Sequence, residues 1–191
     1  MNEVTSILLA GVGGQGVLRA SDILSETLME AGFDVKKSEV HGMAQRGGSV
    51  TSFVRFGKKV YSPTGAKGEA KILLSFEKME VLRYLDFLAP NGKIIVNDEE
   101  INPPACNLGV AEYVSNIDVF AKEISKNIQH ISATELAKKA GSVRATNTVL
   151  LGTLSKHLSI SPAIWKKVLT KSFPEKLLAL NLKAFDLGRA E

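Results

Sequence analysis

The sequence predicts an α/β fold in which a mostly parallel sheet is flanked by helices. Strand-like and helix-like segments alternate through the N-terminal half, a pattern typical of β-α-β units. The first apolar run is followed at once by a glycine-rich turn and a helical pattern. From Thr134 onward the pattern is helical only. The expected architecture is therefore Rossmann-like, with a helical C-terminal region.

The first unit is a strand, a turn and a helix. Residues 6–10 form a short apolar run, and glycines follow directly. Val17, Leu24 and Leu28 then recur at helical spacing, which predicts an amphipathic helix after the turn. Gly32 is expected to end that helix.

Two further strands are expected after this helix. Residues 34–40 predict a polar strand, and residues 49–55 alternate and are rich in β-branched side chains. Gly57 and Lys58 are expected to turn the second of these strands back into a hairpin partner at residues 60–61.

The middle of the chain adds two buried strands, at residues 72–74 and 94–96. Between them we expect a helix over residues 77–88 and a turn at residues 89–92. Residues 102–104, with two consecutive prolines, predict an irregular loop.

A short helix at residues 117–124 and a last strand at residues 128–131 precede the helical region. Thr134 and Ser161 are typical helix starts, and Pro174 is expected to open the final helix. No internal repeat or break in composition divides the chain, which favours a single domain over residues 1–191.

Composition excludes several classes of protein. The 191 residues are 45% hydrophobic and 23% charged, as in an ordinary globular domain. No apolar run approaches the roughly 20 residues needed to cross a bilayer. The net charge of +4 comes from scattered lysines rather than a basic run. We therefore expect neither a membrane nor a nucleic acid as partner.

The single cysteine, Cys106, limits redox chemistry. It excludes an internal disulfide and an iron–sulfur cluster held by four thiolates of this chain. The first residues lack the pattern of a signal peptide, so we expect a cytoplasmic protein. His41, His130 and His157 show no metal-ligand spacing, and no metal site is expected.

The first motif with chemical potential is Gly11-Val12-Gly13-Gly14-Gln15-Gly16, which satisfies G-x-G-x-x-G between a strand and a helix. Such glycines allow a tight turn, approach of a pyrophosphate and close helix–strand packing. The N–H groups at the helix start attract an anion. Three interpretations stay open: a dinucleotide with Glu39 as ribose-binding acid, another anion, and a turn that serves only packing or an interface.

The second motif runs from Glu39 to Ser49 and surrounds a polar cluster with glycines. Arg46, next to Gly47 and Gly48, is expected to direct its planar fork toward a phosphate or carboxylate. His41 can donate to the same group. The alternative is a tight connection with an exposed arginine. Farther along the chain, Asn147 is expected to cap a helix start.

Together, the two glycine motifs resemble those of the gamma-type subunits of 2-oxoacid:ferredoxin oxidoreductases. The segment 39–48 favours the indolepyruvate branch of that family, where the corresponding chain is the beta subunit. A third, weaker feature is an Asn–apolar–Gly helix, matched by Asn147 and Gly152. The resemblance spans essentially residues 1–191, which implies one gamma-type catalytic domain of the pyruvate/ketoisovalerate oxidoreductase kind.

The resemblance implies an enzyme that oxidatively decarboxylates a 2-oxoacid, here an arylpyruvate, to acyl-CoA and CO2 and reduces ferredoxin. It also implies a large partner subunit that carries thiamine diphosphate and iron–sulfur clusters. This agrees with the sequence, since one cysteine cannot hold the clusters and no thiamine diphosphate motif is present. The chain alone is therefore expected to be inactive.

What remains for this chain is the partner interface and part of a coenzyme A site. No catalytic residue is assigned. The expected cofactor-binding residues are those of the two motifs: Gly11, Gly13, Gly14, Gln15, Gly16, His41, Gln45, Arg46, Gly47 and Gly48. Two alternatives remain, a stand-alone NAD(P)-binding Rossmann-type oxidoreductase and a purely structural subunit.

Overall fold

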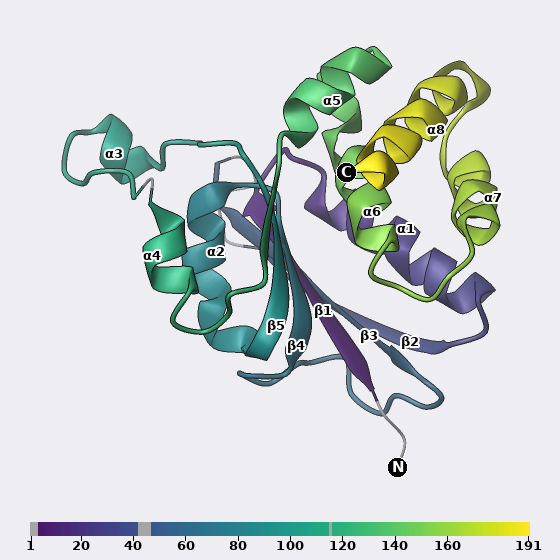
Figure 1. Ribbon diagram of the computed structural model, residues 1–191, viewed down its shortest axis with the longest axis horizontal. Helices are drawn as coiled ribbons and strands as arrows, with labels where there is room; N and C mark the ends of the chain where they lie inside the picture. Colours follow the sequence, from purple (N-terminus) through teal and green to yellow (C-terminus); the bar gives the residue numbers. More distant parts are fainter. Residues whose placement is uncertain (1–3, 42–46, 115) are drawn as a thin grey trace.

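The computed structural model describes residues 4–41, 47–114 and 116–191, which form a mixed sheet between two layers of helices (Figure 1). In chain order the elements are β1 (Thr5–Val12), α1 (Val17–Glu30), β2 (Asp34–His41), β3 (Ser49–Gly57), β4 (Ala70–Ser75), α2 (Lys78–Tyr84), the 3-10 helix η1 (Leu85–Phe87), β5 (Leu88–Asn97), α3 (Pro104–Asn107), α4 (Ile117–Ala121), β6 (Ile128–Ile131), α5 (Ala133–Ala140), the 3-10 helix η2 (Val143–Ala145), α6 (Thr146–Ser155), α7 (Pro162–Ser172) and α8 (Glu175–Ala190).

The strand order across the sheet is β2-β3-β1-β4-β5-β6. β1, β4, β5 and β6 pair in parallel, whereas β3 runs antiparallel to both β1 and β2. The segment between β2 and β3 is too short for the crossover of a dozen or more residues that a parallel pair needs. The predicted fold class, mostly parallel and flanked by helices, is confirmed.

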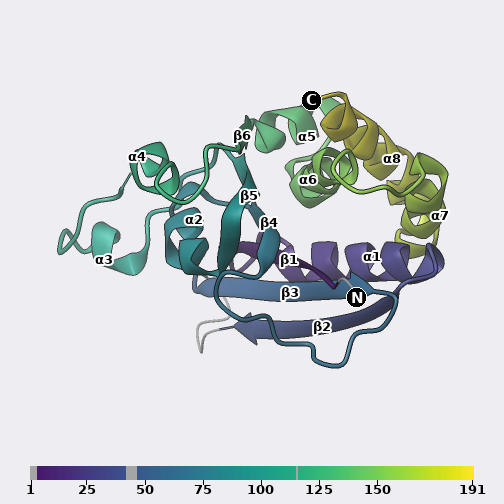
Figure 2. The same cartoon turned by 60° about the horizontal axis from the view of Figure 1, so that its bottom comes forward.

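Alternation along the strands divides the core between the two faces of the sheet. Ile7 and Leu9 of β1 face the layer formed by α1 and the C-terminal helices α5 to α8. Leu8 and Ala10 face the opposite layer, which contains α2 and α4. Figure 2 shows α1 and the C-terminal helices gathered on one side of the sheet.

The helical C-terminal region packs through a close crossing of α6 and α8. A Cβ atom at Gly152 would lie 2.2 Å from the Phe185 carbonyl oxygen, and one at Gly188 would lie 1.9 Å from the Val149 carbonyl oxygen. The Thr153 hydroxyl donates to the Gly188 carbonyl at 2.9 Å. The two helices therefore approach each other backbone to backbone, and only glycine fits at these two positions.

The strands expected at residues 6–10, 34–40, 49–55, 72–74 and 94–96 are all present, and β6 has the expected bounds. The expected hairpin partner at residues 60–61 was wrong, because residues 58–69 form a loop instead.

Side chains hold this loop over the β2–β3 pair. The Arg55 guanidinium donates to the carbonyls of Ser62 at 3.1 Å and Thr64 at 2.6 Å. The Val60 N–H donates to the Asp34 carboxylate at 2.9 Å, where a strand would need a backbone carbonyl. Gly65 lies against the ring of Phe53, so close that a Cβ atom would stand 2.4 Å from it.

The helix expected over residues 77–88 is shorter, because α2 ends at Tyr84 and β5 already begins at Leu88. Residues 89–92 were expected to form a turn but lie within β5. The pairing with β4 jumps there from Ala70–Leu88 to Ile72–Lys93, and Asn91 has a φ of 58°. The turn residues thus form a bulge inside the strand. Among the described residues, no helix is long and apolar enough to cross a membrane.

Replacing Gly152 by Ala tests the close crossing. Alanine is the better helix former by about 1 kcal/mol, so propensity alone predicts higher stability. The clash with the Phe185 carbonyl predicts the opposite, a loss of about 1–3 kcal/mol or more from overpacking. We expect the melting temperature to fall by several degrees. Leu177→Ala, at a side chain that is 42% exposed on α8, is the control and is expected to change little. A higher melting temperature for Gly152→Ala would contradict the crossing.

Candidate functional site

Backbone hydrogen bonds join the glycine turn after β1 to the glycine pair before β3. The Gly13 N–H donates to the Gly48 carbonyl at 2.8 Å, and the Gly47 N–H lies 3.4 Å from the Gly13 carbonyl. These bonds continue the β1–β3 ladder beyond its last pair, Val12 and Ser49. The two motifs of the sequence therefore meet where β1 ends and β3 begins.

The glycines of the first motif have different physical roles. Gly14 and Gly16 have φ values of +107° and +82°, a region that other residues rarely adopt. A Cβ atom at Gly16 would also lie 2.8 Å from Nδ2 of Asn147. At Gly11 close packing excludes a side chain, since a Cβ atom would lie 2.8 Å from Cβ of Phe76.

The side chain of Gln15 braces the ends of three strands. Its Oε1 accepts from the Val12 N–H at 2.8 Å, at the end of β1. Its Nε2 donates to the Phe76 carbonyl at 2.9 Å, just after β4, and lies 3.4 Å from Oε2 of Glu99, beyond β5. Gln15 is thus held by contacts within the chain, and its first role is to fix the turn.

Glu99 lies at the centre of a second set of contacts. Its Oε2 accepts from Nδ2 of Asn97 at 3.0 Å and from the Thr134 hydroxyl at 3.1 Å. Oδ1 of Asn97 accepts from the Ala133 N–H at 3.0 Å, at the start of α5. These contacts fix the Glu99 carboxylate beside the glycine turn.

A cavity of about 390 Å³ opens beside the turn. It is lined by Gly14, Gln15, Gly16, Glu99, Thr134, Val143, Arg144, Thr146 and Asn147. The cavity therefore lies beyond the carboxyl ends of the parallel strands, where open α/β sheets usually bind their ligands.

Helix α1 begins at this cavity directly after Gly16. Its N-terminus is not capped by a side chain, and its first turn lacks an acidic residue. α6 continues directly from η2, and its first N–H group, that of Thr146, donates to the Val143 carbonyl. The first N–H groups of a helix have no partner within the helix, and they carry its positive dipole end. Arg144 is exposed at the same cavity and makes no ion pair with any residue that the structure describes. This side of the cavity suits an anion.

A smaller cavity of about 250 Å³ lies on the other side of Gly47 and Gly48. The buried Glu80 lines it and accepts hydrogen bonds from the Ser49 hydroxyl and from Nε of Arg83, the latter at 2.8 Å. Burial raises the pKa of the Glu80 carboxyl. These contacts fix the start of β3 and so the position of the glycine pair.

A larger cavity of about 780 Å³ lies at the other ends of the strands, near the start of β1. Phe33, Phe56 and Ile160 are among its lining residues. None of the residues of the two glycine motifs lines it in the described part of the chain, so it is not the site that the motifs predict.

Residues 42–46 of the second motif, which include Gln45 and Arg46, fall outside the described residues. For His41 the structure gives its place at the end of β2. Asn147 was expected to cap a helix, and this was wrong. Ala145 is the N-cap of α6, and Asn147 follows in the first turn, where its amide lies against Gly16.

Sequence reasoning missed Glu99, Thr134 and Arg144. They come from separate segments and share no local spacing. An acidic residue soon after a buried parallel strand was the one available signal for Glu99. Glu39, considered as a ribose-binding acid, instead pairs with Lys37 at 2.6 Å and does not line the cavity.

Comparison with known proteins identifies the family. The family model described as pyruvate ferredoxin/flavodoxin oxidoreductase matches residues 6–191. The indolepyruvate oxidoreductase subunit IorB of Pyrococcus horikoshii is 39% identical over 188 residues, which cover 96% of this chain and 93% of that protein.

Two solved structures share the fold. One is a 2-oxoglutarate:ferredoxin oxidoreductase from Magnetococcus marinus with 2-oxoglutarate, coenzyme A and succinyl-CoA bound, at a TM-score of 0.75 and 25% identity. The match covers all of this chain and 31% of that longer chain. The other is the pyruvate oxidoreductase subunit PORC of Thermotoga maritima, at a TM-score of 0.74 and 22% identity over 99% of this chain and 97% of that one. The resemblance inferred from the two glycine motifs is confirmed, and the chain belongs to the pyruvate ferredoxin/flavodoxin oxidoreductase family.

Proposed function

We propose that this chain is the cluster-free subunit of a 2-oxoacid:ferredoxin oxidoreductase that acts on an arylpyruvate such as indolepyruvate. The complete enzyme decarboxylates the 2-oxoacid, passes electrons to ferredoxin and releases acyl-CoA and CO2. Support comes from the relative at 39% identity, which carries the name of an indolepyruvate oxidoreductase subunit.

The larger partner subunit would hold thiamine diphosphate and the iron–sulfur clusters. A cluster usually needs four thiolates, and this chain has one cysteine. The division leaves this chain two tasks, which are binding the larger subunit and forming part of the coenzyme A site.

The observation that carries the coenzyme A proposal is that the uncapped N-terminus of α1 and the exposed Arg144 line one cavity. Coenzyme A presents a pyrophosphate, and helix N-termini with a nearby arginine are typical phosphate-binding groups. The relative from Magnetococcus marinus is described with coenzyme A bound. Residues that fit the ligand are therefore present in this chain.

Within the proposed site the roles differ. Gly14 and Gly16 line the cavity and provide close approach of the backbone, while Gly11 and Gln15 hold the turn in shape. Gly13 joins the turn to Gly47 and Gly48 through its backbone groups. Arg144 and the Asn147 amide face the phosphates, and Glu99 offers an acceptor to a donor group of the same ligand. His41, Gln45, Arg46, Gly47 and Gly48 form a second set of proposed contacts, to coenzyme A or to the larger subunit.

The subunit assignment is tested with the separate chains. We expect the isolated chain to be colourless and inactive with arylpyruvate, coenzyme A and a viologen acceptor, because it lacks cluster ligands. Turnover is expected once the larger subunit is added. Sustained turnover by the isolated chain would contradict the proposal. Full activity and full coenzyme A affinity of the larger subunit alone would make this chain a purely structural subunit.

Arg144→Ala in the assembled enzyme tests the coenzyme A site. A hydrogen bond to a charged group contributes about 1.5–3 kcal/mol, so the Kd for coenzyme A should rise roughly 10- to 100-fold by calorimetry. Arg144→Lys is expected to recover part of the affinity, because lysine keeps the charge but loses the fork. Lys139→Ala removes an equal charge from the exposed surface of α5 and is the control. Values within threefold of each other for Arg144→Ala and the control would remove Arg144 from the site.

A further inference from the structure

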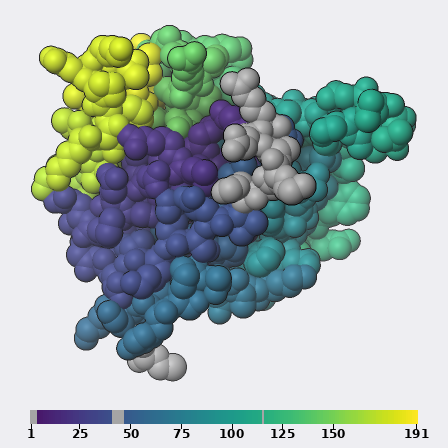
Figure 3. Space-filling model, turned by 180° about the vertical axis from the view of Figure 1, so that it is seen from behind, coloured from purple at the N-terminus to yellow at the C-terminus, as the bar shows by residue number. Residues whose placement is uncertain are grey.

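The segment from Asp98 to Ala121, here named the acidic arm, projects from the body of the molecule with α3 near its tip (Figures 1 and 3). It contains no lysine or arginine, although the whole chain carries 24 basic and 20 acidic residues. Its acidic residues are Asp98, Glu99, Glu100, Glu112 and Asp118. Most of these carboxylates are engaged within the chain: Glu100 pairs with Lys78 at 3.1 Å, Asp98 and Asp118 contact His130, and Glu99 is fixed at the cavity. Glu112 is exposed and makes no ion pair with any described residue.

The acidic arm also exposes apolar side chains. Leu108 is 78% exposed, Val110 76%, Val119 57% and Phe120 51%. With Val114, they make up five of the eleven large hydrophobic residues that are exposed in the described part of the chain. Single exposed apolar residues are ordinary, but a cluster on one projection marks an interaction surface.

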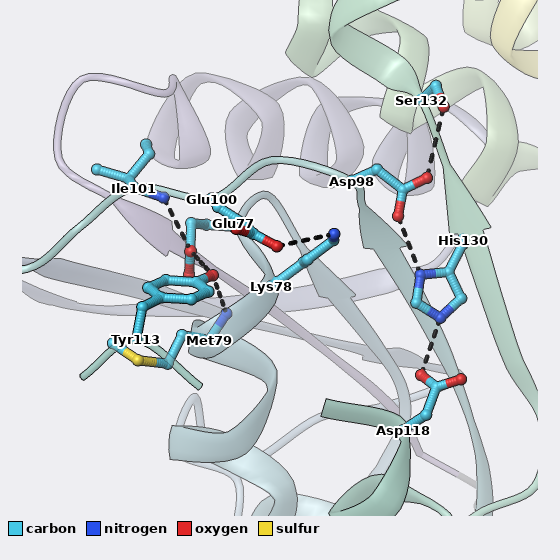
Figure 4. A network of polar contacts seen from close by, with 10 residues as sticks. All are labelled: Glu77, Lys78, Met79, Asp98, Glu100, Ile101, Tyr113, Asp118, His130 and Ser132. Carbon is cyan, nitrogen blue, oxygen red and sulfur yellow. Dashed lines mark hydrogen bonds and ion pairs between the residues drawn. The ribbon is translucent and has the colours of Figure 1, made fainter. Parts of the chain in front are cut away.

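One end of the arm is clamped through Glu77, at the start of α2 (Figure 4). The Glu77 carboxylate is buried and accepts from the Ile101 N–H at 3.1 Å and from the Tyr113 hydroxyl. The Tyr113 oxygen accepts in turn from the Met79 N–H at 3.2 Å. Burial and the neighbouring carboxylate raise the pKa of Tyr113, so its hydroxyl stays a donor.

A second clamp closes the base of the arm through His130 of β6 (Figure 4). Its Nδ1 lies 3.0 Å from Oδ1 of Asp98, and its Nε2 lies 2.9 Å from Oδ1 of Asp118. The Ser132 hydroxyl lies 3.4 Å from the other oxygen of Asp98. Because both ends are held, the apolar tip is presented in a defined place.

We propose that the acidic arm is the surface on which the larger subunit of the enzyme docks, an inference that rests on the proposed function. Leu108 and Val110 enter an apolar pocket of that subunit, and a lysine or arginine at the rim of the pocket faces Glu112. An apolar centre with a polar rim of complementary charge is typical of specific protein interfaces.

Two observations favour this occupant. In the Magnetococcus marinus relative the same fold is 31% of one longer chain, so the remainder of that chain stays attached to it. The relative from Pyrococcus horikoshii is named as a subunit and is matched over 93% of its length, so a chain of that kind needs a surface that makes this association without a covalent link. A second copy of this chain is disfavoured, because a twofold interface through the tip of the arm would bring two exposed Glu112 carboxylates together.

The test uses the double variant Leu108→Ser, Val110→Ser and the purified larger subunit. We expect the Kd of the complex to rise at least tenfold, while the melting temperature of the variant stays unchanged because both side chains are exposed. The matched control is Met29→Ser, Tyr61→Ser, at side chains that are 54% and 87% exposed outside the arm. Neither residue belongs to the two glycine motifs or to the cavity beside the turn, so the control is expected to bind as the unaltered chain does.

The outcomes separate the two proposals. If the unaltered chain binds the larger subunit and the arm variant binds it equally well, the arm is not the interface and the proposed function stands. If the unaltered chain does not bind, the proposed function fails and the arm's role fails with it. If the variant abolishes self-association of the isolated chain but leaves the complex intact, the occupant is a second copy and the proposal is overturned.

Discussion

The hydrogen bonds of the Gln15 side chain are the interaction on which the candidate site depends. An amide supplies an acceptor and a donor together, whereas a carboxylate or an ammonium group supplies one kind. Gln15 uses both, toward the end of β1 on one side and toward the Phe76 carbonyl and Glu99 on the other. Each buried polar group left without a partner costs about 1–3 kcal/mol, so the geometry of the turn depends on this one side chain.

The helical C-terminal region completes the site from the opposite side. Its close α6–α8 crossing fixes the axis of α6, and the N-terminus of α6 places Asn147 against Gly16 and follows directly on Arg144. The packing of α6 against α8 and the arrangement of the cavity are therefore physically connected. A change at the crossing that shifts α6 along its axis would also move Asn147 and Arg144 at the cavity.

The sequence was informative where structure depends on local patterns. Apolar runs predicted the buried strands, and Gly11 to Gly16 predicted the turn and its helix. The hairpin partner at residues 60–61 failed because side-chain contacts hold that segment as a loop, from Arg55 nearby and from Asp34, which lies 26 residues before Val60. Glu99, Thr134 and Arg144 escaped prediction for the same reason, since tertiary packing alone brings them together.

The order of the strands also affects the chain before it meets a partner. An edge strand presents unpaired backbone groups and invites pairing with another molecule. One edge of this sheet is β6, which has four residues, and the other is β2, which carries Lys36, Lys37 and Glu39. Short length and charge are the usual protections against edge-to-edge aggregation. A free chain would thus avoid indiscriminate strand pairing during the interval between its synthesis and its incorporation into a complex.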